Sequence, residues 1–168
     1  MWIEMKQLKN LDCTNKKIIV RVDLNVPVFE DKITDYSRIH AILPTLEKLT
    51  KNKNKVFLIA HFGRPKGEVN KKYSIEFLCP ELKKLLNLNK VHFLDSCDQK
   101  IIEKKISEMG FGEICLLENI RFYAEEEKNA LNFSKQLSSC FDIYINDAFS
   151  ASHRNHASIT GITKYLPS

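Results

Sequence analysis

Short apolar runs rich in β-branched residues recur along the chain, and each is followed by a segment with helical spacing. The runs cover residues 18–22, 56–60, 91–94, 114–117 and 143–145. They are continuously apolar rather than alternating, which is typical of strands covered on both faces. This alternation predicts one α/β domain over residues 1–168, with a parallel β-sheet, helices on both faces and right-handed crossovers.

Apolar residues spaced three and four positions apart predict the helices between these strands. The helical positions are Ile39, Leu43, Leu46 and Leu49; Phe77, Leu82, Leu85 and Leu86; Ile101, Ile102, Ile106 and Met109; and Leu131, Phe133 and Leu137. Ser74 is expected to cap the second helix at its N-terminus, and Gly110 to close the third. Pro44 and Pro80 each remove a backbone donor, so we expect a kink or a later start in the helices that contain them.

One segment interrupts the alternation. Residues 26–35, VPVFEDKITD, place turn-forming Glu30 and Asp31 between two β-leaning pieces. This pattern predicts a small hairpin between the first strand and the first helix.

Charge and cysteine content narrow the class of protein. The net charge of +5 comes mostly from lysines scattered over many segments, whereas a nucleic-acid surface needs a continuous basic stripe with stacking aromatics. Phe62 and Phe122 are assigned instead to packing. The five cysteines show no CxxC spacing, which indicates neither a disulfide framework nor a zinc site. No secretion signal or membrane-length apolar run is visible, so we expect a cytoplasmic protein without nucleic-acid or membrane partners.

Charged and hydrogen-bonding residues follow four of the five predicted strands. They are Asp23 and Asn25; His61, Gly63, Arg64 and Gly67; Glu118 and Arg121; and Asp147, His153 and Arg154. Arg38 opens the first predicted helix. Open parallel sheets bind ligands beyond the carboxyl ends of their strands, so these residues are predicted to share one site.

The residue types indicate the chemistry of the ligand. Arginine guanidinium groups match carboxylate and phosphate oxygens, and His61 and His153 offer further donors. Asp23 and Asn25 can accept a hydrogen bond from a hydroxyl. The predicted ligand therefore carries two anionic ends and a hydroxyl between them. The sequence holds no GxxxxGK[ST], GxGxxG or GxSxG motif and no metal-ligand spacing, so no nucleotide or metal site is predicted on it.

Structural roles remain open for several of these residues. An arginine at a strand end often forms a surface ion pair, and Asp23 can pair with Arg21 or Arg38. Glu118 and Asp147 are expected to position the arginines rather than to touch a ligand. Three other histidines, His40, His92 and His156, are assigned to exposed or structural positions.

Four motifs resemble those of the phosphoglycerate kinase family, in the same order and with the same spacing. They are VRVDLNVP (20–27), HFGRPKG (61–67), LLENIRFYAEEEKN (116–129) and INDAFSASHRNHAS (145–158), and the resemblance covers essentially the whole chain. It implies the N-terminal lobe of a two-lobe monomeric enzyme, which binds 3-phosphoglycerate or 1,3-bisphosphoglycerate. The C-terminal lobe of that family binds Mg-ATP or Mg-ADP.

The resemblance also implies residue roles. Asp23 and Asn25 resemble the residues that hold the hydroxyl and carboxylate end of the substrate. The residues that resemble its phosphate-holding patch are His61, Gly63, Arg64, Arg121 and Arg154. Arg38 resembles the arginine closest to the phosphoryl group, which passes in line between the acyl phosphate and ADP without a covalent enzyme intermediate.

The sequence departs from the family pattern in a few places. It has Leu24 where the family often has Phe, and Ser150-Ala151-Ser152 before His153. It stops at Ser168, near where the first lobe of the family gives way to the hinge, so we expect no Mg-nucleotide on this chain and no turnover by it alone. Its expected partner is the C-terminal lobe of the same enzyme. The alternative is a stand-alone binding module for a phosphorylated acid.

Overall fold

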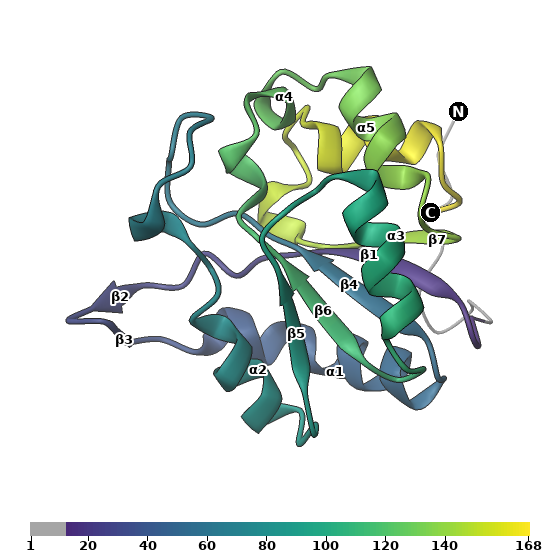
Figure 1. Cartoon of the computed structure of the whole chain (residues 1–168). Helices are drawn as coiled ribbons and strands as arrows, with labels where there is room; N and C mark the ends of the chain where they lie inside the picture. The colour runs from purple at the N-terminus through teal and green to yellow at the C-terminus, as the bar shows by residue number, and fades with distance from the viewer. Residues whose placement is uncertain (1–12) are drawn as a thin grey trace.

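A five-stranded parallel sheet forms the centre of the molecule in a computed structural model, which describes residues 13–168 (Figure 1). The strands are β1 (Lys17–Val22), β4 (Lys55–Ile59), β5 (Val91–Leu94), β6 (Ile114–Leu117) and β7 (Ile143–Asp147). Their order in the sheet is β5-β6-β4-β1-β7, and every neighbouring pair is parallel. The five predicted strands and the parallel sheet are confirmed.

Helices cover both faces of the sheet, as predicted (Figure 1). One face carries α1 (Ser37–Lys51) and α2 (Leu78–Leu85), and the other carries α3 (Gln99–Glu108) and α5 (Leu131–Ser138). The short helical segments are η2 (Lys71–Tyr73), η3 (Ile120–Phe122), α4 (Ala124–Glu127), η4 (Phe149–Ala151), η5 (Ala157–Gly161) and η6 (Ile162–Lys164). Several of these lie between a strand end and the next large element, where they carry polar side chains.

Side chains along β1 alternate between two hydrophobic cores. Ile18 and Val20 pack with α1 and α2, whereas Ile19 packs with α3 and α5, and all three are fully buried. Burial of each such side chain contributes about 1.5–3 kcal/mol. Because strand side chains alternate, Arg21 follows Ile19 on the second face, and only 1% of it is exposed. A cation is thus buried beside the carboxyl end of β1.

The second helix starts later than its capping signal predicts. The helix α2 begins at Leu78, with Pro80 in its first turn, so the later start expected from this proline is confirmed. The expected N-cap at Ser74 is wrong, because the Ser74 hydroxyl donates to Glu118 Oε2 at 2.7 Å instead. Helix α1 runs from Ser37 to Lys51 through Pro44 without a later start.

The expected closure of the third helix by Gly110 is also wrong. Helix α3 ends at Glu108, and the left-handed backbone that favours glycine lies at Gly112, with φ of 88°. The Gly112 N–H donates to the carbonyl of Asn54 at 2.8 Å, so a contact with the β4 entry sets the turn. The predicted place of Ile101 on the apolar side of this helix is not matched by burial, because 43% of it is exposed.

The predicted hairpin is present and projects from the body of the molecule (Figure 1). Its strands are β2 (Val28–Phe29) and β3 (Lys32–Ile33), which pair in antiparallel fashion. Glu30 and Asp31 form the turn with positive φ angles of 47° and 58°. Two left-handed residues in succession suit the twist of a two-residue hairpin.

Edge strand β7 is covered by the end of the chain, because Tyr144 N–H donates to the carbonyl of Pro167 at 3.0 Å.

Within residues 13–168, no helix combines the length and apolarity needed to cross a membrane.

Candidate functional site

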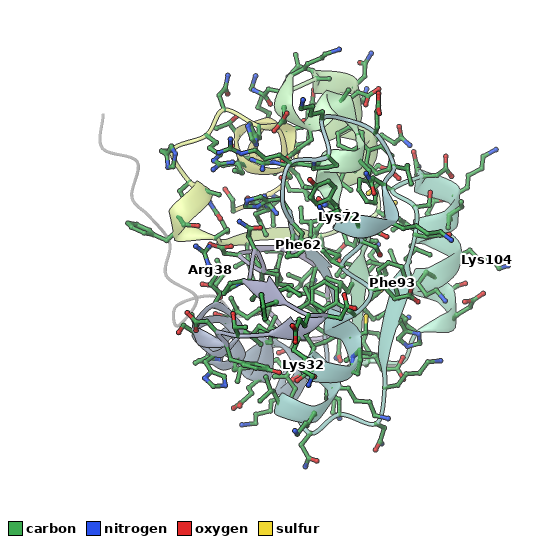
Figure 2. All side chains as sticks on the ribbon, turned by 90° about the vertical axis from the view of Figure 1, so that its left-hand side faces the viewer. Lys32, Arg38, Phe62, Lys72, Phe93 and Lys104 are labelled. Carbon is green, nitrogen blue, oxygen red and sulfur yellow. The ribbon has the colours of Figure 1, made fainter. Side chains whose placement is uncertain are left out.

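The predicted site residues lie at one edge of the molecule, where the central strands end. Figure 2 faces the side toward which β1 runs, and Arg38 and Phe62 both lie on it. We call this group the arginine edge; its members are Asp23, Asn25, Arg38, His61, Gly63, Arg64, Arg121 and Arg154. The carboxyl ends of β1, β4, β6 and β7 bring it together from segments far apart in the sequence.

Asp23 receives three hydrogen bonds at the end of β1. Its Oδ2 accepts from Arg38 Nη1 and from the Ser150 hydroxyl, and its Oδ1 accepts from the Asn25 N–H at 3.2 Å. Burial alone would raise the pKa of Asp23, but these donors and the Arg38 charge hold it below its usual value. A carboxylate offers about four acceptor positions, so capacity remains for one further donor.

Gly63 links the ends of three strands. Its N–H donates to Asn25 Oδ1 at 2.9 Å, and its carbonyl accepts from Arg121 Nη1 at 2.9 Å. The φ of Gly63 is +60°, and a Cβ there would lie 2.5 Å from the Tyr73 ring, so only glycine fits without rearrangement. Both backbone groups of Gly63 are therefore used within the protein, where they orient Asn25 and Arg121.

Asn119 holds the loop that contains Gly63 through side-chain hydrogen bonds. It is fully buried, and its side-chain amide donates to the carbonyls of Phe62 and Tyr73 at 2.7 and 2.8 Å. Its Oδ1 accepts from the backbone N–H groups of Phe62 and Arg121 at 3.3 and 3.1 Å. The β4 and β6 loops thus form one rigid unit.

His61 is buried directly after β4, with 4% exposure. Arg21 Nη2 donates to its Nδ1 at 3.1 Å. Burial, with repulsion from Arg21 and Arg121, lowers the pKa of His61 to about 3, so the ring is neutral near pH 7. His153, the other histidine predicted to offer a donor, is exposed and lies beyond η4.

The remaining arginines differ in how they are held. Arg121 is 7% exposed, and its Nε lies 3.2 Å from Glu127 Oε1, although the N–H is not aligned for a hydrogen bond. Arg154 is half-buried and close enough to Arg121 to lower its pKa further, after the larger effect of burial. Arg64 is exposed. Neither Arg64 nor Arg154 makes a side-chain hydrogen bond or ion pair with any residue from 13 to 168. These guanidinium groups are therefore available to an anion.

A buried carboxylate under the arginine edge is missed by the sequence analysis. Glu126 is fully buried, and it accepts from the Ser158 N–H at 2.8 Å and from the Ser158 hydroxyl at 2.6 Å. His156 Nδ1 lies 3.6 Å from its Oε1. Glu126 thereby joins the segment that follows Arg121 to the segment that follows Arg154. It stands in a run of three glutamates on the single turn of α4, so no periodicity distinguishes it.

The positioning role expected for Glu118 and Asp147 is wrong. Glu118 accepts from Ser74 Oγ, from Ile75 N–H and from its neighbour Asn119 N–H, not from an arginine. Asp147 Oδ2 is buried without a partner among the described atoms, and burial raises the pKa of this carboxyl. Arg38 pairs with Asp23, and Arg21 pairs with His61, so one of the two suggested Asp23 pairs forms.

The packing and structural assignments agree with the structure. Phe62 packs on Phe77 with ring centroids 5.5 Å apart, and Phe122 is 7% exposed. His92 pairs with Glu113 at 2.7 Å, and His40 is exposed.

Comparison with known proteins gives the family. The sequence model of "Phosphoglycerate kinase" matches residues 8–168. The chain belongs to the phosphoglycerate kinase family. It is 46% identical over 166 residues to the phosphoglycerate kinase of Wolbachia pipientis wMel, covering 99% of this chain and 41% of that protein. It is 49% identical over 163 residues to the enzyme of Prochlorococcus marinus strain MIT 9312, covering 95% and 40%. The chain thus spans about two fifths of the length of these phosphoglycerate kinases.

Solved structures of the family share this fold. Phosphoglycerate kinase from Coxiella burnetii matches with a TM-score of 0.83 and 33% identity, over 95% of this chain and 40% of that one. The enzyme from Pyrococcus horikoshii OT3 matches with a TM-score of 0.85 and 31% identity, over 97% and 42%.

The donor groups at the arginine edge suit an anion rather than a metal ion. Among residues 13–168, no group of three or more His, Cys, Asp or Glu side chains is placed to hold a metal. Two shallow hollows of about 660 and 670 Å³ lie elsewhere, between η2, α2 and β5, and share Lys71, Ser74, Glu76 and Phe93. Part of the arginine edge faces solvent, because Arg64 is exposed and 44% of the Arg38 side chain is exposed.

Proposed function

We propose that this chain is the N-terminal, substrate-binding lobe of a phosphoglycerate kinase, spanning residues 1–168. The reaction is phosphoryl transfer between ATP and 3-phosphoglycerate, giving ADP and 1,3-bisphosphoglycerate, in glycolysis. Family membership supports the reaction, and the arginine edge supports the assignment of this chain to the anionic substrate.

The observation that carries the proposal is the concentration of cationic donors with little counter-charge. Arg64 and Arg154 make no side-chain hydrogen bond or ion pair among residues 13–168, while Arg121 is held in place by Gly63. Planar guanidinium groups in such a cluster recognise phosphate and carboxylate oxygens in bidentate fashion. The remaining acceptor position of Asp23 suits the substrate hydroxyl.

The proposed site residues are those predicted from the sequence. Asp23 and Asn25 hold the hydroxyl and carboxylate end, and the phosphate is held by His61, Gly63, Arg64, Arg121 and Arg154. Gly63 contributes through its neighbours, because its own N–H and carbonyl are taken.

Arg38 is the proposed catalytic residue. It lies in the first turn of α1 with 44% of its side chain exposed, and it pairs with Asp23. An exposed guanidinium at this position can move onto a phosphoryl group that arrives from a second surface, where it offsets developing negative charge.

The nucleotide is assigned to the C-terminal lobe of the same enzyme. Residues 13–168 include no group of three or more His, Cys, Asp or Glu side chains placed to hold Mg²⁺. An open anion site needs a second surface to exclude water, so phosphoryl transfer requires that partner lobe. The chain by itself is expected to bind substrate weakly and to show no turnover.

Calorimetric titration of the chain with 3-phosphoglycerate tests this assignment, with Mg-ATP as the parallel ligand. We expect binding of the acid alone. Arg38→Ala and Arg64→Ala should each weaken it about 10- to 100-fold, because a hydrogen bond to a charged group contributes about 1.5–3 kcal/mol. Lys104→Ala is the matched control. It removes one positive charge from α3, which lies on the other side of the view from Arg38 in Figure 2. Equal weakening by all three variants, or no binding by the folded chain, would contradict the site.

A complementation assay of phosphoryl transfer separates the enzyme lobe from a stand-alone binding module. A lobe of an enzyme should gain phosphoryl transfer when the remainder of the family's chain is supplied, whereas a binding module should not.

A further inference from the structure

A buried arginine contacts the histidine of the arginine edge. Arg21 lies on the β1 face packed by α3 and α5, and only 1% of it is exposed. Its Nη1 donates to the carbonyl of Ile59 at 3.2 Å, and its Nη2 donates to His61 Nδ1 at 3.1 Å. Both contacts are made to the end of β4, directly where His61 leaves the sheet.

This contact decides which nitrogen of His61 carries the proton. A guanidinium group has five N–H donors and no acceptor. His61 Nδ1 must therefore accept, so it cannot carry a hydrogen. A neutral imidazole has one N–H, which leaves the proton on Nε2.

The other nitrogen is available to a ligand. His61 Nε2 has no hydrogen-bond partner among residues 13–168. It is not one of the fully buried polar atoms without a partner, so some of its surface is accessible. Asp23, Arg121 and Arg154 all lie near enough to His61 to act on its charge. The Nε2–H therefore opens onto the arginine edge.

We propose that Arg21 is a positioning residue that holds His61 as its neutral Nε2–H tautomer, so that His61 presents one directed donor to the anionic substrate. The tautomer follows from the Arg21 contact alone, and the substrate-presenting role rests on the proposed function. In this arrangement Arg121 and Arg154 provide the positive charge, and His61 provides one hydrogen-bond donor of fixed orientation. Substrate affinity should then be free of a His61 titration step between pH 5 and 8.

Two other roles for Arg21 make different predictions. If Arg21 acts only as a distant positive charge, its loss should weaken substrate binding equally whether or not His61 is present. If it only fills the core, its loss should lower stability without changing the protonation of His61.

Nitrogen-15 NMR spectra of the histidine rings test the tautomer in the intact chain. His61→Gln identifies the His61 signals among those of the five histidines. We expect Nδ1 without a hydrogen and Nε2 with one throughout pH 5–8. A titration midpoint near the ordinary value, or a hydrogen on Nδ1, would overturn the proposal.

Arg21→Met tests the cause. This substitution fills similar space without a donor, so both tautomers of His61 should appear and its pKa should rise. Arg21→Lys is the second variant, used if Arg21→Met does not fold. It should keep a donor to only one of the two acceptors, the Ile59 carbonyl and His61 Nδ1. Unchanged His61 spectra in a folded Arg21→Met would overturn the positioning role.

A double-mutant cycle with 3-phosphoglycerate tests the consequence for binding. Arg21→Met should weaken binding about tenfold or more in the wild-type chain, and clearly less in a His61→Leu background. Additive losses would overturn the action through His61. Failure of the wild-type chain to bind 3-phosphoglycerate would overturn the proposed function and the substrate-presenting role, whereas the tautomer is decided by the spectra alone.

Discussion

The guanidinium group of Arg121 donates to the carbonyl of Gly63 at 2.9 Å, across two loops that are 58 residues apart in the sequence. The N–H of the same glycine donates to Asn25. One backbone position therefore joins the ends of β1, β4 and β6. The orientation of two predicted substrate-binding side chains depends on the conformation of this glycine.

Substitution of Gly63 by alanine should both destabilise the chain and disturb the site. Its left-handed φ and the 2.5 Å approach of a new Cβ to Tyr73 predict a loss of about 2 kcal/mol in unfolding free energy. Denaturant unfolding measures this loss. Gly110→Ala is the matched control, because its Cβ would meet only the Glu113 side chain, at 3.6 Å, and it should change stability by less than about 0.5 kcal/mol. Similar losses at both positions would contradict the role of Gly63.

The buried carboxylate of Glu126 should be essential for stability. Glu126→Gln removes the charge that faces Ser158, His156 and the buried Arg21, and breaking a buried charged contact costs about 3 kcal/mol. Thermal and denaturant unfolding measure the loss. Glu125→Gln is the control, since it removes the same charge from an exposed neighbour. If the two variants unfold alike, Glu126 does not join the two arginine-bearing segments.

The pH dependence of stability should carry a signature of His61. Its pKa is lowered from 6.5 to about 3 by burial and by the Arg21 and Arg121 charges. Between these values the unfolded chain binds a proton that the folded chain does not, so stability rises with pH by up to about 1.4 kcal/mol per pH unit. The contribution is complete above pH 6.5 and is lost as the pH falls toward 3. Between pH 5 and 6.5, the free energy of unfolding should rise less steeply with pH for His61→Gln than for the wild type. His40→Gln is the exposed control.

Two arginines of the site should separate binding from stability. Arg121 is 7% exposed and anchored to Gly63, whereas Arg64 is exposed and makes no side-chain hydrogen bond or ion pair among residues 13–168. Arg121→Ala should cost about 2 kcal/mol of stability, and Arg64→Ala less than about 0.5 kcal/mol. Both should weaken binding of 3-phosphoglycerate. Equal destabilisation by the two variants, measured by thermal unfolding, would argue against Arg121 as a structural anchor.

Local patterns were sufficient for the strands and the hairpin. Residues 91–94 and 114–117 form strands with the predicted bounds, because continuous apolar runs can satisfy burial only between two helical layers. The Glu30–Asp31 turn is equally local. Helix ends were less predictable, since Ser74 carries a capping side chain but donates it to Glu118, 44 residues away.

The topology of the sheet predicts which polar residues gather at the strand ends, but it does not predict which of them pair with one another. A parallel sheet brings all carboxyl ends to one edge, so the sequence alone determined that Asp23, His61, Arg121 and Arg154 would gather there. Only the tertiary structure decided that Arg38 pairs with Asp23 and that Glu126 joins the segment after Arg121 to the segment after Arg154. It also decided that His61 is neutral. Pairing and protonation depend on distance and burial between residues far apart in the chain, and neither quantity is encoded in a local pattern.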